Sequence, residues 1–396
     1  MKQGWEEKRL DEVYDVRDGT HESPKFHSNG YPFLTSKNLK DGVLNFNKVQ
    51  YISEEDYNEY NKRSKVDKGD VLFAMIGTLG NPVVVEVEPN FAIKNVALIK
   101  VPKNQSNYFL KYYLESQGVV DKIYRDARGT TQKFVGLGNL RKFKILLPPL
   151  SEQQRIVSLL DETFAALAQV HANAERNLVN AREVFEAVLE ETFNKEGKDW
   201  GENNLGELCE RITDGTHVTP KYVSEGVPFL SVKNLTKGFI DFSDTRFITP
   251  EEHQVLTKRV RPVRDDVLYT KVGTTGIAKV VDVDREFSIF VSIALLKIKH
   301  DVIFNRYLEY FLNSPFARKQ AQKRTRGTAN KNLVINDIKQ IEIHYPKSLE
   351  EQRAIVQRLD ALAGETRRLE AVYQSKLEGV DELRKSVLQK AFEGGL

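Results

Sequence analysis

Two basic stretches of the chain carry side chains suited to contact with a phosphodiester backbone. Arg318 to Lys331 (RKQAQKRTRGTANK) holds six lysines and arginines and no acid, while Lys122 to Lys133 (KIYRDARGTTQK) holds four bases against Asp126. Guanidinium and ammonium groups bind phosphates, and the amides of Gln132 and Asn330 can read base edges. Either stretch alone also fits a solvent-exposed helix face. Both contain RGT followed by two residues and a lysine, however, so we predict contact with nucleic acid.

A lysine-asparagine pair follows a short apolar run in each half of the chain and adds to these candidates. Lys271 is included because the matching position in the other half is Met75, and unlike side chains at matching positions are expected to read different bases. The residues predicted to contact nucleic acid are Lys37, Asn38, Arg128, Thr130, Thr131, Gln132, Lys133, Lys233, Asn234, Lys271, Arg324, Arg326, Thr328, Asn330 and Lys331.

Two further motifs could do chemistry but fit structural roles better. The loops GTLG (Gly77 to Gly80) and GTTG (Gly273 to Gly276) lack the Lys-Ser/Thr of a P-loop, so we expect turns near the nucleic acid. The sequence DGTH begins at Asp18 and again at Asp214, where its Asp and His could form an acid-base pair or bind a metal. No third ligand stands at metal spacing, which favours an aspartate that shapes a turn. We therefore expect no metal, no cofactor and no catalytic residue.

These motifs recur because the second half of the chain repeats the first. In order, DGTHESPKF returns as DGTHVTPKY, YPFLTSKNL as VPFLSVKNL, DVLFAMIGTLG as DVLYTKVGTTG, and RGTTQK as RGTANK. Runs such as DVLFAMI and ALIKV are rich in β-branched and aromatic residues and predict strands, whereas the apolar spacing of Asn107 to Tyr124 predicts a helix. Each half therefore contains an α+β globular domain of about 150 residues.

Each globular part is followed by a long stretch of helical periodicity, Leu150 to Phe193 and Leu349 to Phe392, interrupted only by Gly364 and Gly379 in the second. Apolar and small residues form a narrow seam that is typical of a coiled coil and is broken once by His171. The seam residues are Val157, Leu160, Phe164, Leu167, Ala174, Leu178, Ala181, Phe185 and Val188, and then Ile355, Leu359, Leu362, Thr366, Leu369, Tyr373, Val380, Leu383 and Val387. An antiparallel pairing would place the two domains at opposite ends of a rod, related by an approximate internal two-fold axis.

The predicted architecture has four parts: a first globular domain at 1–149, a spacer helix at 150–198, a second globular domain at 199–347 and a second spacer helix at 348–396. The single cysteine, Cys209, excludes an internal disulfide framework and multi-cysteine zinc sites, and we expect it to be buried. The charged N-terminus and the lack of an apolar run of about 18 residues predict no membrane partner and a cytoplasmic location. A net charge of +3 is too small to identify a partner by itself.

Taken together and in order, the motifs resemble the specificity subunit of type I restriction-modification systems over essentially the full chain. The resemblance rests on the helix starts LPPLSEQQRIVSLLDE and YPKSLEEQRAIVQRLDA, the DGTH entries, the RGT loops and the closing SVLQKAFEGGL. It implies two target recognition domains that each read one half of a bipartite double-stranded DNA target. It also implies that the helices measure the unread gap and dock two methylation (M) subunits, with restriction (R) subunits joining through the complex.

The resemblance also implies a non-catalytic chain, since adenine methylation and ATP-dependent cleavage belong to the partner subunits. The sequence contains no Asn-Pro-Pro-Tyr or Asp-Pro-Pro-Tyr motif and no Walker A motif. Exposed helix positions such as Glu175, Arg182 and Glu183 are candidates for partner docking, or simply solvated. Two alternatives stay open: a two-headed coiled-coil scaffold without DNA specificity, and a free-standing methyltransferase or nuclease with a coiled-coil insert.

Overall fold

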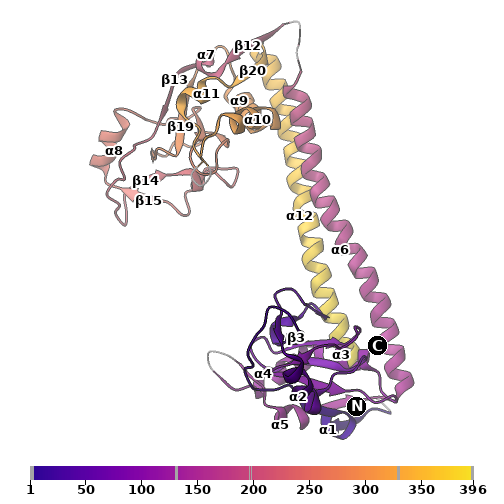
Figure 1. Cartoon of the computed structure of the whole chain (residues 1–396). Helices are drawn as coiled ribbons and strands as arrows, with labels where there is room; N and C mark the ends of the chain where they lie inside the picture. The colour runs from indigo at the N-terminus through magenta and orange to yellow at the C-terminus, as the bar shows by residue number, and fades with distance from the viewer. Residues whose placement is uncertain (1–3, 130–132, 196, 198, 328–330, 394–396) are drawn as a thin grey trace. The chain divides into compact units, whose positions relative to one another are not determined.

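The computed structural model describes residues 4–129, 133–195, 197, 199–327 and 331–393. The chain forms two compact units, one made of Met1–Glu175 with Ser375–Leu396 and the other of Arg176–Gln374. Each unit contains one globular domain and one end of each of two long helices, α6 (Leu150–Phe193) and α12 (Leu349–Glu393) (Figure 1). No helix of the described chain is long and apolar enough to cross a membrane.

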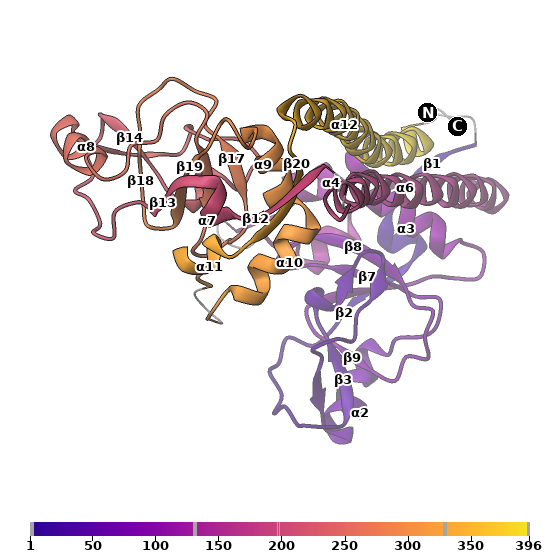
Figure 2. The same ribbon diagram turned by 90° about the horizontal axis from the view of Figure 1, so that it is seen from above.

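The first domain is built around a four-stranded antiparallel sheet in the order β2-β10-β7-β8. A small sheet, β6-β3-β9, lies with α2 beyond this sheet on the side away from α6 (Figure 2). The strands are β1 (Glu6–Arg9), β2 (Asp15–Asp18), β3 (Tyr31–Leu34), β4 (Leu39–Lys40), β5 (Val43–Leu44), β6 (Gln50–Ile52), β7 (Val71–Ala74), β8 (Gly80–Val84), β9 (Ala92–Ile93), β10 (Val96–Lys100) and β11 (Lys144–Leu147). The helices are α1 (Leu10–Val13), the 3₁₀ turn η1 (Ser36–Asn38), α2 (Glu54–Ser64), α3 (Asn107–Glu115), α4 (Gln117–Asp126) and α5 (Leu137–Arg141).

The second domain repeats this arrangement, with a central sheet β13-β19-β16-β17 and a small sheet β15-β14-β18. Its strands are β12 (Trp200–Asn204), β13 (Cys209–Asp214), β14 (Val227–Leu230), β15 (Arg246–Ile248), β16 (Val267–Thr270), β17 (Ala278–Val280), β18 (Ser288–Ile289), β19 (Ile293–Ile298) and β20 (Glu342–Pro346). Its helices are α7 (Leu205–Leu208), η2 (Val232–Asn234), α8 (Pro250–Thr257), α9 (Asn305–Asn313), α10 (Pro315–Arg324) and α11 (Ile335–Lys339). The common sheet order confirms the predicted α+β class and the internal repeat.

The predicted helix from Asn107 to Tyr124 is two helices, and this prediction was wrong in its continuity. Ser116 adopts an extended conformation (φ −64°, ψ 138°) and separates α3 from α4, while its hydroxyl donates to the carbonyl of Tyr113 at 2.7 Å. Ser314 occupies the matching place between α9 and α10, and the following Pro315 has no N–H to continue the first helix. A serine in extended conformation therefore ends the first helix in each domain, although the apolar spacing runs through both segments.

An aromatic residue at the C-terminal end of each long helix anchors it to a domain core. In the second unit, Phe193 of α6 lies with its ring 5.3 Å from Tyr307 and 5.7 Å from Phe311. In the first unit, the ring of Phe392 of α12 lies 5.4 Å from that of Phe109 and 5.3 Å from that of Tyr113. The end of one helix and the start of the other thus share a core in each unit, which is the predicted antiparallel pairing.

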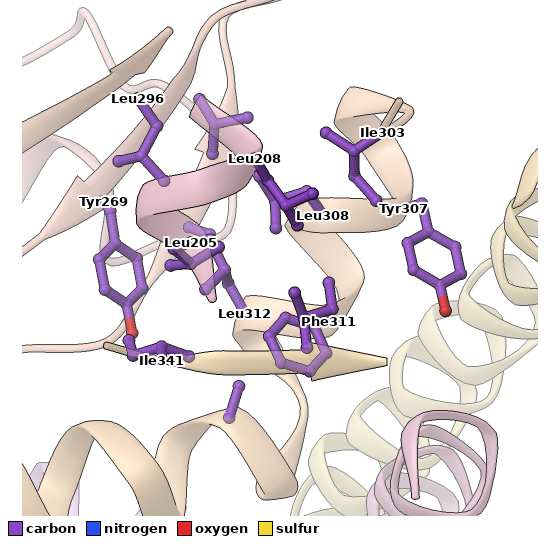
Figure 3. Packing of buried hydrophobic residues seen from close by; sticks show 14 of the residues in the cluster. Leu205, Leu208, Tyr269, Leu296, Ile303, Tyr307, Leu308, Phe311, Leu312 and Ile341 are labelled. Atoms are coloured by element: carbon purple, nitrogen blue, oxygen red, sulfur yellow. The ribbon is translucent and has the colours of Figure 1, made fainter. Parts of the chain in front are cut away.

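Figure 3 shows how this core is filled in the second unit, with side chains of α7 and α9 converging beside β20. Leu308, Phe311 and Leu312 of α9 recur at three- and four-residue steps, so one helix face is buried against the sheet. Burial of a side chain of this size contributes about 1.5–3 kcal/mol. This core fixes the position of the strands of the central sheet. The loops that connect those strands are thereby held in place.

The seam of the long helices follows the predicted spacing with two exceptions. Leu369 and Leu383 of α12 are 37% and 49% exposed and do not lie in the seam, so their assignment to it was wrong. Two fully buried glutamines, Gln153 of α6 and Gln352 of α12, join the helices to their domains. Gln153 accepts a hydrogen bond from the backbone N–H of Ser106 at 2.9 Å and donates to the carbonyl of Pro148 at 2.8 Å.

Candidate nucleic-acid interface

In each domain, four loops that are distant in sequence lie together where strands of the central sheet end. We name them the DGTH loop (Asp18–His21 and Asp214–His217), the lysine-asparagine loop (Thr35–Asn38 and Ser231–Asn234), the glycine-threonine loop (Gly77–Gly80 and Gly273–Gly276) and the RGT loop (Arg128–Lys133 and Arg326–Lys331). Together they form what is called here the loop edge. Backbone hydrogen bonds that the two domains share, described next, show that the glycine-threonine loops, the DGTH loops and the described ends of the RGT loops are held in the same way in both.

The glycine-threonine and RGT loops are joined directly by their backbones. In the first domain, Gly77 N–H donates to the carbonyl of Lys133, and Val135 N–H donates to the carbonyl of Met75, both at 2.9 Å. The second domain has the same pair of bonds, from Gly273 to Lys331 at 2.9 Å and from Leu333 to Lys271 at 2.8 Å. The predicted turns therefore support the RGT loops.

The DGTH loop packs against the connection between β9 and β10 in the first domain and between β18 and β19 in the second. Gly19 N–H donates to Val96 O at 2.9 Å, and Thr20 N–H donates to Ile93 O at 3.1 Å. A Cβ atom on Gly19 would overlap the carbonyl oxygen of Ile93, so only glycine fits there. Gly215 stands in the same relation to Ile289 in the second domain. The glycine of DGTH is therefore required for the close approach of two backbone segments.

The aspartate of DGTH is a buried anchor for this loop. Asp18 accepts hydrogen bonds from the guanidinium of Arg63, in the last turn of α2, and from His21 Nε2 at 3.0 Å. Asp18 thus has the turn-shaping role that the sequence favoured. Among the described residues no group of three His, Cys, Asp or Glu could hold a metal ion.

Asp214 has an additional cationic partner in the second domain. It accepts from Arg259 Nη2 at 2.9 Å, from His217 Nε2 at 3.2 Å and from Lys271 Nζ at 3.2 Å. Burial by itself raises the pKa of this carboxyl, but hydrogen bonds from Lys271 and His217 outweigh burial and hold the pKa below its usual range. Asp214 is therefore ionised at neutral pH, and the cluster is an ion-pair network.

Three of the residues predicted to touch nucleic acid lie behind the surface. The Oδ1 of Asn38 accepts from Thr35 N–H at 2.9 Å and its amide donates to Asn45 O at 2.9 Å, and Asn234 bonds in the same way to Ser231 and Asp241. Lys271, only 4% exposed, is held by Asp214. These side chains shape the loop edge, and we no longer count them as direct contacts.

The remaining predicted residues differ in their exposure and in whether they already have a hydrogen-bond or ion-pair partner within the protein. Lys37, Arg128, Lys133 and Lys331 are exposed at the loop edge, whereas Lys233 pairs with Asp244 at 2.9 Å. Arg324 is half-buried and donates to the carbonyls of Gln320 and Gln340 at 3.2 Å, while the exposed Arg326 lies 3.4 Å from Asp337. Thr130, Thr131, Gln132, Thr328 and Asn330 lie outside the described residues.

Sequence reasoning missed Arg63 and Arg259, which hold the buried aspartates. Their signal was available, because Lys62-Arg63 and Lys258-Arg259 stand at matching positions of the repeat. Cys209 is buried as expected, and burial raises the pKa of its thiol to about 12, which makes it unreactive at neutral pH. The described residues of the loop edge thus offer cations and backbone groups suited to binding a polyanion.

A family model described as the type I restriction modification DNA specificity domain matches residues 2–178 and 197–378. The chain belongs to this family. Two matches, one over each repeat unit, agree with the duplicated fold. This specificity-subunit family recognises DNA sequence and is not catalytic, which confirms the predicted role and does not favour the scaffold alternative.

Relatives of this DNA specificity family cover most of the chain. The type I restriction enzyme EcoBI specificity subunit of Escherichia coli is 25% identical over 93% of this chain and 84% of its own length. The MjaVIII specificity subunit of Methanocaldococcus jannaschii is 22% identical over 92% of this chain and 85% of its own length.

Solved structures share the fold. A chain from a type I R-M system structure, on complex assembly and conformational transition, is 21% identical with a TM-score of 0.76, covering 100% of this chain and 99% of its own. The HsdS subunit from Thermoanaerobacter tengcongensis is 20% identical with a TM-score of 0.62, covering 100% and 98%.

Proposed function

We propose that the two domains, predicted at 1–149 and 199–347, each read one half of a bipartite DNA target, while the spacer helices at 150–198 and 348–396 set the unread gap. The observation that carries this proposal is the loop edge, which is built twice with the same backbone bonds but different side chains. Two loop edges with the same backbone arrangement but different side chains are suited to reading two half-sites of different sequence. The described exposed cations Lys37, Arg128, Lys133 and Lys331 are assigned to phosphates, and Arg326 shares this role.

The base-reading role is assigned to the positions of the RGT sequences at which the two domains carry different side chains. Thr131 and Gln132 in the first domain correspond to Ala329 and Asn330 in the second. Amide side chains bind adenine edges in pairs of hydrogen bonds and discriminate by about 1–3 kcal/mol. Exchanging Gln132 for Asn and Asn330 for Gln should alter the preferred bases. An unchanged target in both variants would contradict this assignment.

The chain is also proposed to assemble with two methylation subunits along the spacer helices and, through that complex, with restriction subunits in the cytoplasm. Glu175, Arg182 and Glu183 are exposed on α6. Arg182 already donates to Glu370 at 2.6 Å, so Glu175 and Glu183 are the better docking candidates of the three. Co-purification of the methylation subunit with charge-reversal variants at these two positions tests the docking role.

The deciding experiment is methylation mapping of genomic DNA from cells that carry this chain with its methylation subunit, compared with cells that lack the chain. A new two-part motif with a fixed gap is expected. Inserting one helical turn into α6 and one into the facing part of α12 should change the gap or abolish binding, while the two half-sites stay the same. If methylation is unchanged although an active methylation subunit is present, the alternative of a scaffold without DNA specificity would be favoured instead.

A further inference from the structure

The first domain contains an open cavity of about 620 Å³ beside the RGT loop, and its wall is strongly basic. The basic lining residues are Lys122 and Arg125 of α4, Arg128 of the RGT loop, Lys142 after α5 and Lys144 of β11. Two acids, Glu7 and Asp126, also line it. The five basic residues are named here the basic pocket. Two stretches of the chain, 122–128 and 142–144, supply them, so the fold and not one charged helix face creates the concentration of charge.

Most of this charge is not neutralised within the protein. Lys144 pairs with Glu7 at 2.8 Å. The other four cations are exposed and form no ion pair with any residue that the structure describes. Cations gathered in one cavity repel one another, and the repulsion is relieved when an anion enters. The arrangement is therefore suited to a ligand that carries several negative charges at a regular spacing.

At the five matching positions of the second domain only Lys323 and Arg326 are basic, in the places of Arg125 and Arg128. Gln320, Gln340 and Glu342 stand where the first domain has Lys122, Lys142 and Lys144, as the shared spacing from α4 and α10 onward shows. Arg326, the counterpart of Arg128, is paired with Asp337 at 3.4 Å. Because both domains fold alike, the lysines of the first domain are not needed for folding. Their presence in one domain alone points to binding.

We propose that the basic pocket binds backbone phosphates of the DNA duplex just outside the half-site read by the first domain. The inference rests on the proposed function. Arg128 belongs to both the loop edge and the basic pocket, so a strand that leaves the edge continues over the pocket. Guanidinium groups such as that of Arg125 bind phosphate oxygens through two hydrogen bonds. The pocket contacts no base, so it strengthens binding without changing the recognised sequence.

The test uses the whole chain in complex with its methylation subunit and measures affinity for target duplex at several salt concentrations. The variant carries Lys122→Gln with Lys142→Gln, which introduces the residues of the second domain. Each phosphate contact contributes about 0.9 to the slope of log affinity against log salt. The slope should become less steep by about two, so that a fourfold rise in salt costs the variant about tenfold less affinity than it costs the original complex.

The reciprocal variant, Gln320→Lys with Gln340→Lys, is the matched control and should make the slope steeper. Shortening the duplex beyond one end of the target should remove the difference between the first variant and the original complex, whereas shortening the other end should not. The methylated motif should be the same in all variants.

Three results would overturn the inference. An unchanged salt slope in the Lys122→Gln, Lys142→Gln variant rules out phosphate contact. Loss of the methylation subunit from that variant, with an unchanged slope, shows that the pocket docks protein. If the original complex shows no preference for any sequence, the proposed function fails as well, which separates the two failures.

Discussion

The ammonium group of Lys271 lies 3.2 Å from the carboxylate of Asp214, and both side chains are buried. This ion pair joins the glycine-threonine loop to the DGTH loop in the second domain. The backbone carbonyl of Lys271 also accepts from Leu333 at 2.8 Å, so one residue ties three segments of the loop edge together. Met75 holds the matching position in the first domain and supplies only the backbone bond. The two loop edges are therefore cross-linked by different side chains, since in the first domain His21 Nδ1 lies 2.6 Å from Asn95 Oδ1 instead.

Replacing Lys271 with methionine should lower the free energy of unfolding of the chain by about 1–3 kcal/mol, since a hydrogen bond between charged groups is lost and a buried carboxylate keeps only two partners. Urea unfolding of the variant checks this. The same variant should relax base preference in one half of the methylated motif and leave the other half unchanged. Met75→Lys is the control and should not gain stability, because Met75 packs in the hydrophobic core of the first domain and a lysine there would bury its charge. Equal loss of preference in both half-sites would show a general folding defect.

The pH dependence of this loss follows from the lowered pKa of Asp214. A carboxyl whose folded pKa lies below its unfolded value of about 4 contributes stability above that value and loses it as pH falls through the folded pKa. The stability difference between the original chain and Lys271→Met should therefore be constant from pH 7 to about 5 and shrink below about 4. Urea midpoints measured at each pH test this. A difference that persists to pH 2 would mean that the lysine acts through packing.

Local patterns predicted the long helices and the repeat, because helical periodicity and matching motifs are properties of neighbouring residues. They failed at Ser116, where an extended serine separates α3 from α4 although the apolar spacing continues, and they failed where a long-range contact decides. Whether Leu383 is exposed depends on where the partner helix lies. The heptad pattern around Leu383 carries no information about that position.

The structure gives some of the predicted site residues a structural role. Asn38 and Asn234 were predicted as contacts because each lysine-asparagine pair follows a short apolar run, yet each asparagine closes a turn three residues after Thr35 or Ser231. That spacing is a capping pattern and could have been recognised. The burial of Lys271 could not have been, because its partner Asp214 is 57 residues away in sequence.

This difference in role gives a paired prediction for the first domain. Lys37→Ala should weaken DNA binding about equally for all sequences and lower the salt slope by about one, as expected for a phosphate contact. Asn38→Ala should instead lower the free energy of unfolding by about 1–3 kcal/mol, because the Thr35 N–H and the Asn45 carbonyl lose a buried partner. Salt titrations and urea unfolding of both variants check this. If Asn38→Ala changes the salt slope with normal stability, the side chain contacts DNA.

The glycine of DGTH predicts a steric effect on the loop edge. Gly19→Ala places a methyl group against the carbonyl of Ile93, and the two backbones must separate, so a loss of more than about 2 kcal/mol in the free energy of unfolding is expected. Gly118→Ala is the matched control, because no atom lies within 4 Å of its added methyl group and alanine favours the helix α4. Thermal unfolding distinguishes them. A Gly19→Ala variant as stable as the control would mean that the DGTH loop can move without cost.

The buried glutamines predict that each domain is held to its helix by a specific clamp. Gln153→Ala leaves the Ser106 N–H and the Pro148 carbonyl without this partner, which should lower the free energy of unfolding by about 1–3 kcal/mol, whereas the exposed neighbour Gln154→Ala should change it little. Because the first domain is positioned by its attachment to α6, Gln153→Ala should also allow methylation at targets whose gap differs from the original. Methylation mapping of the two variants tests this. A variant with lowered stability but an unchanged, single gap would show that the remaining core contacts, such as those of Leu160, hold the domain in register without the clamp.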